Sequence, residues 1–237
     1  MTDVKLPISE TFVSLQGEGK LTGVPSWFVR LSGCNLRCGW CDTPYASWNA
    51  EGESRAIAEL VEEARASNVG HAVVTGGEPM IFNEVGTLTR ALGNAGLHIT
   101  IETAGTVFRE VECDLMSLSP KLANSTPAEG DTRDPLGVWR ERHEQRRLNF
   151  EALQALIDST PDRQLKFVVS EPGDLAEIER VLAQLTGWAA EDVQLMPEGT
   201  SVPEPGRVAW VVEACLARGW RYCHRLHVEL FGDRRGT

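Results

Sequence analysis

The sequence predicts an α/β fold with a mostly parallel sheet, arranged as an incomplete (β/α)6-type barrel. Segments with the alternation of strands take turns with segments of helical periodicity along most of the chain. About six such units can be traced, which is short of the eight that close a barrel. Polar and glycine-rich motifs directly follow several of the strands, where parallel α/β folds place their chemistry. The fold class therefore also predicts where the functional site lies.

The first half of the chain alternates strand and helix patterns. The predicted strands are residues 8–15, 26–31, 72–75, 98–102 and 115–119. One helix runs to about Ala66, with Ser54 as its N-cap and with Ile57, Leu60, Val61 and Ala64 as its buried stripe. A second helix carries Val85, Leu88 and Leu92.

The second half begins with a polar, proline-interrupted stretch, residues 124–147, which is expected to be a surface loop. It leads into a helix with Phe150, Leu153 and Ile157. Asp174 and Glu177 predict a capping box, followed by a helix that buries Leu175, Ile178, Val181, Leu182 and Leu185. The other predicted elements are strands at 165–169, 193–196 and 222–230 and a helix at 207–217.

Strand alternation places four charged or titratable residues on the face opposite the aliphatic side chains. They are Arg30, Glu102, Lys166 and His227. If the aliphatic faces meet the helices, these four side chains point into the barrel. Charges there are costly unless they pair with one another or bind something polar. Both interpretations stay open, and the second one indicates a small charged substrate.

Composition limits the kinds of partner. The 237 residues suit one domain over 1–237, with 124–147 as a polar insertion. A net charge of −11 makes nucleic acid and anionic membranes poor partners. No apolar run is long enough to span a bilayer, and the polar start, Met-Thr-Asp-Val-Lys, does not resemble a signal peptide. A cytoplasmic protein is expected.

Cysteine spacing carries the strongest functional signal. Cys34, Cys38 and Cys41 form a CxxxCxxC motif with no fourth cysteine in the same run. A structural zinc site would need another ligand, such as Asp42 or a distant histidine. An electron-carrying 4Fe-4S cluster would need a fourth cysteine, and the closest one in the sequence, Cys113, is far downstream. Three thiolates on a cluster instead leave one iron free to hold a small molecule.

This spacing resembles that of the radical S-adenosylmethionine (SAM) enzymes, in which the open iron chelates SAM. Gly76-Gly77-Glu78-Pro79, which follows a predicted strand, is similar to the element of that superfamily that lines the SAM amino group. The resemblance implies a radical SAM barrel. It also implies a cluster that passes an electron to SAM and releases a 5′-deoxyadenosyl radical.

The combination of motifs is more particular. It includes Leu15-Gln-Gly-Glu-Gly19, Cys41-Asp-Thr43, Thr75-Gly-Gly-Glu-Pro79, Glu102-Thr-Ala-Gly-Thr106, Ser119-Pro-Lys121 and Arg225-Leu-His227. Together they resemble the 7-carboxy-7-deazaguanine synthase (QueE) family. The resemblance covers about 9–121 and resumes near the C-terminus. It implies ring contraction of 6-carboxy-5,6,7,8-tetrahydropterin to 7-carboxy-7-deazaguanine with loss of ammonia, in queuosine and related deazapurine biosynthesis. It further implies that SAM is regenerated and that Mg²⁺ is required.

The resemblance also assigns residues. It gives Cys34, Cys38 and Cys41 to the cluster and Thr43 to Mg²⁺. It gives SAM the residues Trp40, Asp42, Gly77, Glu78, Ser119, Pro120 and Lys121. It gives the pterin Leu15, Gln16, Gly17, Arg30, Thr75, Glu102 and His227. Lys166 stays unassigned, and Cys113, Cys215 and Cys223 are interpreted as structural.

The family further implies a homodimer and a flavodoxin- or ferredoxin-type electron donor. Ala104 departs from the Asn expected in its motif, and the chain lacks the longer loop that some members have between the first two cysteines. Two rivals remain. A glycyl-radical-activating enzyme shares Gly-Cys-Asn-Leu-Arg-Cys but acts on a partner protein, and a zinc- or cluster-stabilised binding module would not be an enzyme.

Overall fold

The computed structural model, which describes residues 4–237, contains one sheet of nine strands in the order β3-β1-β2-β4-β5-β6-β7-β8-β9. The strands are β1 (Lys5–Leu15), β2 (Pro25–Leu31), β3 (Glu53–Ala56), β4 (His71–Gly76), β5 (His98–Thr103), β6 (Leu115–Leu118), β7 (Arg163–Val169), β8 (Val193–Pro197) and β9 (Arg221–Tyr222). From β2 to β9 every neighbouring pair is parallel, whereas β1 runs antiparallel to β2 and β3. The sheet is open, which confirms the predicted incomplete barrel.

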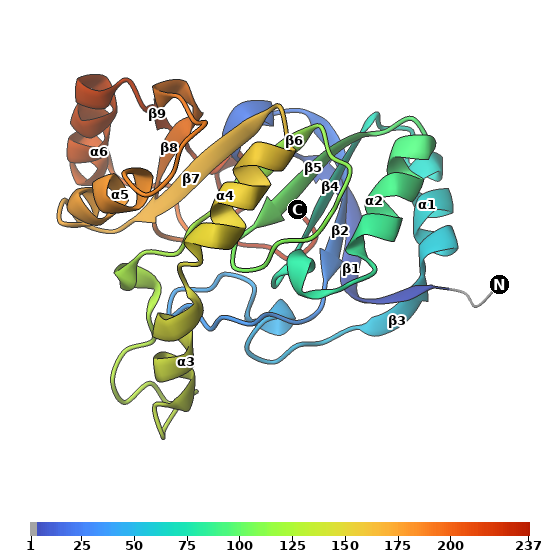
Figure 1. Cartoon of the computed structure of the whole chain (residues 1–237), viewed down its shortest axis with the longest axis horizontal. Helices are drawn as coiled ribbons and strands as arrows, with labels where there is room; N and C mark the ends of the chain where they lie inside the picture. Colours follow the sequence, from blue (N-terminus) through green and yellow to red (C-terminus); the bar gives the residue numbers. More distant parts are fainter. Residues whose placement is uncertain (1–3) are drawn as a thin grey trace.

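The helices are α1 (Ile57–Ala66), α2 (Val85–Asn94), α3 (Val138–Arg146), α4 (Phe150–Ser159), α5 (Asp174–Leu182), α6 (Pro205–Arg218) and α7 (Leu226–Phe231). Five of them, α1, α2, α4, α5 and α6, cover one face of the sheet (Figure 1). Their buried stripes join the aliphatic faces of the strands in one hydrophobic core. Trp27, Leu31 and Phe167 lie in this core, as the strand alternation predicts.

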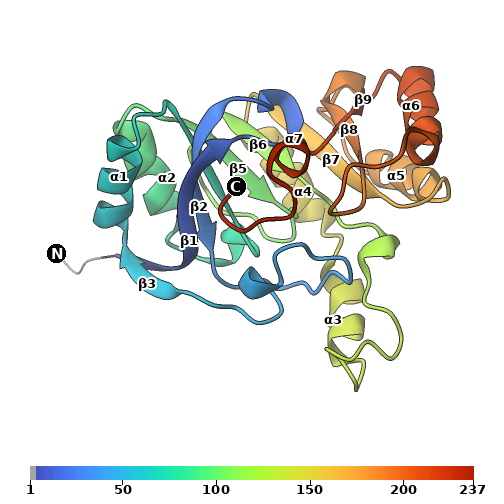
Figure 2. The ribbon, with the colours of Figure 1, turned by 180° about the vertical axis from the view of Figure 1, so that it is seen from behind.

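The other two helices lie elsewhere. Viewed from behind, α7 and the C-terminal segment cross the opposite face of the sheet (Figure 2). In both views α3 projects from the body below the carboxyl ends of the strands. Neither helix contributes a side chain to the main core of the described residues. The sheet thus has a helix-covered face that provides stability and a face that is free to form a site.

The predicted strand over 222–230 is wrong. Pairing with β8 ends at Tyr222, and the amide of Leu226 instead donates to the Gly17 carbonyl at 2.9 Å, where α7 begins. The apolar alternation that suggested a strand is not a buried face, because Leu230 is 51% exposed. His227 nevertheless faces the predicted interior.

Two predicted caps are also wrong. Ser54 lies within β3, which pairs with β1, so the helix begins only at Ile57. Asp174 accepts from the backbone amides of Ser170 and Glu171 at 2.7 and 3.2 Å, which precede the helix, so no capping box forms. Tertiary contacts override the local signal at both positions.

The stretch 124–147 is not only a loop. It contains α3, which starts after Gly137 at a φ of 67°. A helix with so few apolar side chains gives no stripe to recognise in the sequence.

Within residues 4–237, no helix has the length and apolar character needed to cross a membrane. Met1, Thr2 and Asp3, part of the polar start noted above, lie outside the described residues.

Candidate active site

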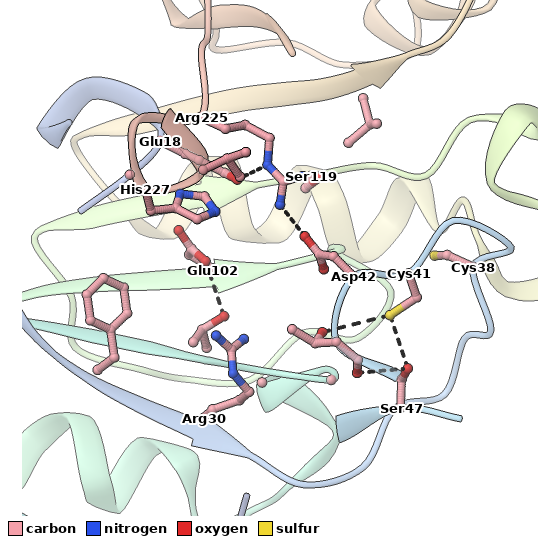
Figure 3. A pocket seen from close by; sticks show the side chains of 18 of the residues that line it. Glu18, Arg30, Cys38, Cys41, Asp42, Ser47, Glu102, Ser119, Arg225 and His227 are labelled. Atoms are coloured by element: carbon pink, nitrogen blue, oxygen red, sulfur yellow. Dashed lines mark hydrogen bonds and ion pairs between the residues drawn. The ribbon is translucent and has the colours of Figure 1, made fainter. Parts of the chain in front are cut away.

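A cavity of about 280 Å³ opens between the sheet and the α7 and C-terminal segment, on the face opposite the five core helices and beside the carboxyl ends of the strands (Figure 3). Almost all residues that the family resemblance assigns line it. They are Leu15, Gln16, Gly17, Arg30, Cys34, Cys38, Trp40, Cys41, Asp42, Thr43, Thr75, Gly77, Glu102, Ser119, Lys121 and His227. Glu78 and Pro120 are assigned as SAM contacts but do not line the cavity.

The three cysteines reach the cavity from the loop after β2. Burial raises the pKa of Cys34 and of Cys38 to about 12, so the apo loop disfavours their thiolates. The Cys41 sulfur lies 3.1 Å from the Ser47 hydroxyl. The loop therefore presents three soft ligands, of which Cys34 and Cys38 need a strongly electropositive partner to stay ionised.

Two glycines allow the cysteine loop to lie close to β4. A Cβ on Gly77 would come within 2.3 Å of the Gly33 carbonyl oxygen and 2.4 Å of that of Ala46. A Cβ on Gly76 would meet the Leu31 carbonyl oxygen at 2.6 Å. Only glycine permits this approach of backbones. The Gly-Gly pair thus fixes where the cysteines stand.

Glu78 has a structural position behind the cavity. Its carboxylate is fully buried and accepts from Thr103 Oγ1 at 2.7 Å and from the amides of Ala104 and Met80 at 2.8 and 3.0 Å. Burial raises the pKa of Glu78 despite these hydrogen bonds. The side chain holds the turn after β4 against the end of β5 and leaves the cavity wall to Gly77.

Glu102 lies in the wall at the end of β5. It accepts from Gln16 Nε2 at 3.2 Å and from Thr75 Oγ1 at 3.1 Å. Figure 3 shows its carboxylate between His227 and Arg30. These neighbours fix the carboxylate. Within residues 4–237 no Lys, Arg or His side chain forms an ion pair with it, so it can accept hydrogen bonds from a ligand.

Arg30 is held by residues that sequence reasoning missed. Its Nε donates to Glu10 Oε1 at 2.7 Å, and the same carboxylate accepts from Tyr45 Oη at 2.8 Å and from Arg235 Nε at 3.0 Å. Although burial opposes its charge, Glu10 and the neighbouring Tyr45 and Asp42 raise the pKa of Arg30. Arg30 is therefore a fixed cation at the cavity wall. Glu10 lies directly opposite Arg30 in the β1–β2 register. The ion pair could therefore have been found from the sequence by assuming that these two strands pair.

The sequence analysis also did not predict a network of ion pairs around Glu18. The carboxylate pairs with Lys166 Nζ and, at 3.1 Å, with Arg225 Nε, and Arg225 also pairs with Asp42. Burial favours the neutral acid, but the charges of Lys166 and Arg225 lower the pKa of Glu18. The pair with Lys166 ties the Gln16-Gly17-Glu18 turn to β7. Figure 3 shows Arg225 between Glu18 and Asp42, where it ties the C-terminal segment to the same turn and to the cysteine loop. Lys166 and Arg30 therefore do form ion pairs, but with Glu18 and Glu10 rather than, as the structural interpretation expects, with the other inward charges.

His227 approaches the cavity from α7, as the resemblance implies, although not from a strand. A Cβ on Gly17 would lie 1.9 Å from His227 Nδ1, so Gly17 is the space that the imidazole needs. Burial lowers the pKa of His227, which therefore favours the neutral ring.

Ser119, Lys121 and Trp40 form the wall beside the cysteines. Lys121 Nζ donates to Ser119 Oγ at 2.7 Å and lies 5.7 Å from the centre of the Trp40 ring. The Trp40 indole N–H donates to Asn124 Oδ1 at 3.4 Å. An indole, a hydroxyl and a cation suit the adenine, ribose and carboxylate of SAM.

The donor set fits a cluster rather than a single ion. Among residues 4–237, no group of three His, Cys, Asp or Glu side chains lies close enough to hold one metal ion. Three thiolates on a 4Fe-4S cluster bind three different irons, so they stand farther apart than ligands of one ion. The Thr43 hydroxyl at the cavity wall is a hard oxygen donor suited to Mg²⁺ that keeps other oxygens in its shell.

Comparisons with known proteins agree with this geometry. A model of the Radical SAM superfamily matches residues 28–166. A crystal structure of SuiB from Streptococcus suis, bound to precursor peptide SuiA, covers 80% of this chain and 46% of that one, with a TM-score of 0.51 and 13% identity, a likeness of fold alone. The chain belongs to the radical SAM superfamily, and it is an enzyme whose cofactors are a 4Fe-4S cluster and SAM.

Curated relatives narrow the class. A 7-carboxy-7-deazaguanine synthase from Rhodopirellula baltica is 48% identical over 237 residues, 100% of this chain and 90% of that protein. One from Halobacterium salinarum is 46% identical and covers 98% and 93%. A crystal structure of QueE from Escherichia coli has a TM-score of 0.69 and 27% identity and covers 94% of this chain and 95% of that one. The chain belongs to the 7-carboxy-7-deazaguanine synthase family.

Proposed function

We propose that the cavity described above is where this chain contracts the ring of 6-carboxy-5,6,7,8-tetrahydropterin to 7-carboxy-7-deazaguanine with loss of ammonia. Family membership sets the reaction class, a radical SAM carbon–nitrogen lyase in deazapurine biosynthesis. The observation that supports the site is the meeting of three thiols with Glu102 and Arg30 on the walls of one cavity. The glycyl-radical-activating alternative is not favoured, since curated relatives over the full length are synthases.

The protein's own residues bind and orient the pterin. Glu102 suits the amide and amino edge of the ring, with Gln16 and Thr75 holding its oxygens. Arg30, fixed by Glu10, suits the substrate carboxylate. Thr43 would hold Mg²⁺, which completes its shell with substrate oxygens. Leu15, Gly17 and His227 close the remaining wall.

Cys34, Cys38 and Cys41 would hold the cluster, while Trp40, Asp42, Gly77, Ser119 and Lys121 would contact SAM. Glu78 and Pro120 would act by shaping these walls. The chemistry supplied by the bound cofactors is hydrogen-atom abstraction from C6 of the pterin and its later return. The chain itself places C6 and excludes water, partly through α7 and the C-terminal segment across the open face of the sheet (Figure 2).

Four further features follow as proposals from the family. The chain works as one radical SAM domain, which is supported by the continuous hydrophobic core shared by the sheet and five helices within residues 4–237. It is a cytoplasmic homodimer, and it receives electrons from a flavodoxin- or ferredoxin-type donor.

Cys38→Ala tests the site. It removes a ligand from the cluster, so iron and sulfide content and product formation should fall to background after anaerobic reconstitution. Cys215→Ala is the matched control, because Cys215 lies in the core between α6 and the sheet and should leave cluster and turnover intact. Full turnover by Cys38→Ala would refute the assignment.

A further inference from the structure

The segment around α3 packs on the outer side of the cysteine loop. The Arg37 amide donates to His143 Nδ1 at 3.2 Å, and His143 Nε2 lies 2.8 Å from Ser125 Oγ. Ser125 also accepts from the Gly39 amide through its carbonyl, at 2.8 Å. The cavity occupies the inner side of the same loop. This segment therefore covers the cluster loop from the side that substrate and SAM do not fill.

Arginines gather on this cover. The Arg37 guanidinium stacks on the Trp139 ring at 3.9 Å, and that of Arg142 lies 5.3 Å from the same ring. Arg146 follows Arg142 by one helical turn and thus lies on the same face. We call Arg37, Trp139, Arg142 and Arg146 the α3 arginine stripe. Arg37 also donates to the Cys34 carbonyl at 2.8 Å, so the stripe begins at a cluster ligand.

The stripe is unneutralised positive charge on an acidic chain. Within residues 4–237 its three arginines have no carboxylate within 4.0 Å. The neighbouring Glu144 is paired with Arg147, and Glu141 accepts from Gln145 on an adjacent row of the helix. With a net charge of −11, a local cationic stripe needs an explanation.

We propose that the α3 arginine stripe is the docking surface for an acidic one-electron carrier protein. The inference rests on the proposed function only in that the cluster must be reduced. Electron transfer weakens steeply with distance, so a carrier has to approach over the cluster loop. The inner side is enclosed, whereas one helix, about 10 Å thick with its side chains, separates the loop from solvent on the outer side. Figures 1 and 2 show α3 projecting beyond the sheet and the other helices, and Arg142 and Arg146 are exposed. Complementary charge raises association rates, and it does so most at low salt.

The test follows reduction of the reconstituted cluster by electron paramagnetic resonance, with SAM but without pterin. The reductant is either an acidic flavodoxin with its reductase or dithionite. In the double variant Arg142→Glu/Arg146→Glu, reduction by flavodoxin should slow by about tenfold at low ionic strength and lose its salt dependence. Reduction by dithionite should be unchanged. Because no pterin is used, failure of the proposed ring contraction would not affect the result.

Arg180→Glu/Arg221→Glu is the matched control, since it makes the same change of charge at exposed positions on α5 and β9. Its cluster should be reduced as fast as that of the parent chain by either reductant. Equal flavodoxin rates for the two double variants would refute the proposal. Slower reduction by dithionite as well would also overturn it, because the arginines would then support the loop. A changed oligomeric state of the α3 variant in sedimentation would assign the face to contact between copies and contradict carrier docking.

Discussion

Among single residues, Glu18 has the most consequential surroundings. Its carboxylate compensates two cations, Lys166 and Arg225, and all three side chains are largely buried in the cavity wall. Removing one partner of a buried ion pair leaves the others uncompensated, at a cost of about 3–5 kcal/mol. The family resemblance at Gln16-Gly17-Glu18 drew attention to the turn, but only the structure shows that its glutamate holds Lys166.

Glu18→Gln should therefore lower the free energy of unfolding of the reconstituted protein by about 3 kcal/mol in urea at pH 7. The control is Glu62→Gln, whose exposed pair with Arg65 should be worth less than about 1 kcal/mol. If the two variants lose the same stability, the Glu18 network does not hold the site together.

A histidine at the opposite end of the sheet predicts a pH dependence. His71 is buried between Ser26 Oγ at 2.7 Å and Thr100 Oγ1 at 2.8 Å. Burial and the charge of His98 lower the pKa of His71 from 6.5 to about 4. Below pH 6.5 the His71 imidazole is protonated in the unfolded chain but stays neutral in the folded chain. This residue therefore makes the free energy of unfolding fall as the pH drops from 6.5 towards 4.

His71→Gln should flatten the fall in the free energy of unfolding between pH 6.5 and 5, measured by urea titration. The control, His224→Gln, changes an exposed side chain and should keep the slope of the parent chain. An unchanged slope in His71→Gln would contradict burial of a neutral imidazole at this position.

At the scale of elements, α7 enters the site through one glycine. The Gly17 carbonyl accepts a hydrogen bond from the Leu226 amide at 2.9 Å, and the lack of a side chain at Gly17 leaves room for the His227 ring. Gly17→Ala should displace that ring and raise the KM for the pterin by about tenfold, or about 1.4 kcal/mol. The chain should remain folded by circular dichroism.

Gly70→Ala is the control for this change, because a Cβ at Gly70 meets nothing within 4 Å. Its kinetics should match those of the parent chain. A Gly17→Ala enzyme with the parent KM would show that His227 does not have to occupy this position.

The contact between α3 and the cysteine loop gives another prediction. His143 is fully buried and joins Arg37 to Ser125. His143→Ala leaves the Arg37 amide and the Ser125 hydroxyl without this partner, at a cost of about 1–3 kcal/mol. The loop should open more often, and a chelator should remove iron from the reconstituted protein several times faster. Iron release at the parent rate would mean that α3 does not stabilise the loop.

At the scale of the whole molecule, the parallel strands could be predicted because their apolar faces repeat with the period of a sheet. The same alternation placed Arg30, Glu102 and Lys166 in the cavity. Short or polar elements could not be predicted this way. α7 has six residues, too few to establish helical periodicity, and α3 contributes nothing to the core.

The candidate site was predictable to the extent that its residues sit in recognisable motifs. Glu10, Tyr45 and Arg235 join the site through ion pairs and hydrogen bonds between segments far apart in the chain. No local pattern encodes such contacts. Glu78 is a motif residue whose surroundings the motif also did not predict, since its carboxylate accepts from Thr103 and Ala104 in the turn behind the cavity.

The central claim is that this cavity contracts a pterin ring. Its most direct test is anaerobic turnover by the reconstituted protein with SAM, a reductant, Mg²⁺ and 6-carboxy-5,6,7,8-tetrahydropterin, followed by mass spectrometry. The account predicts 7-carboxy-7-deazaguanine, released ammonia and SAM that is not consumed stoichiometrically. An intact cluster that cleaves SAM but leaves the pterin unchanged would contradict it.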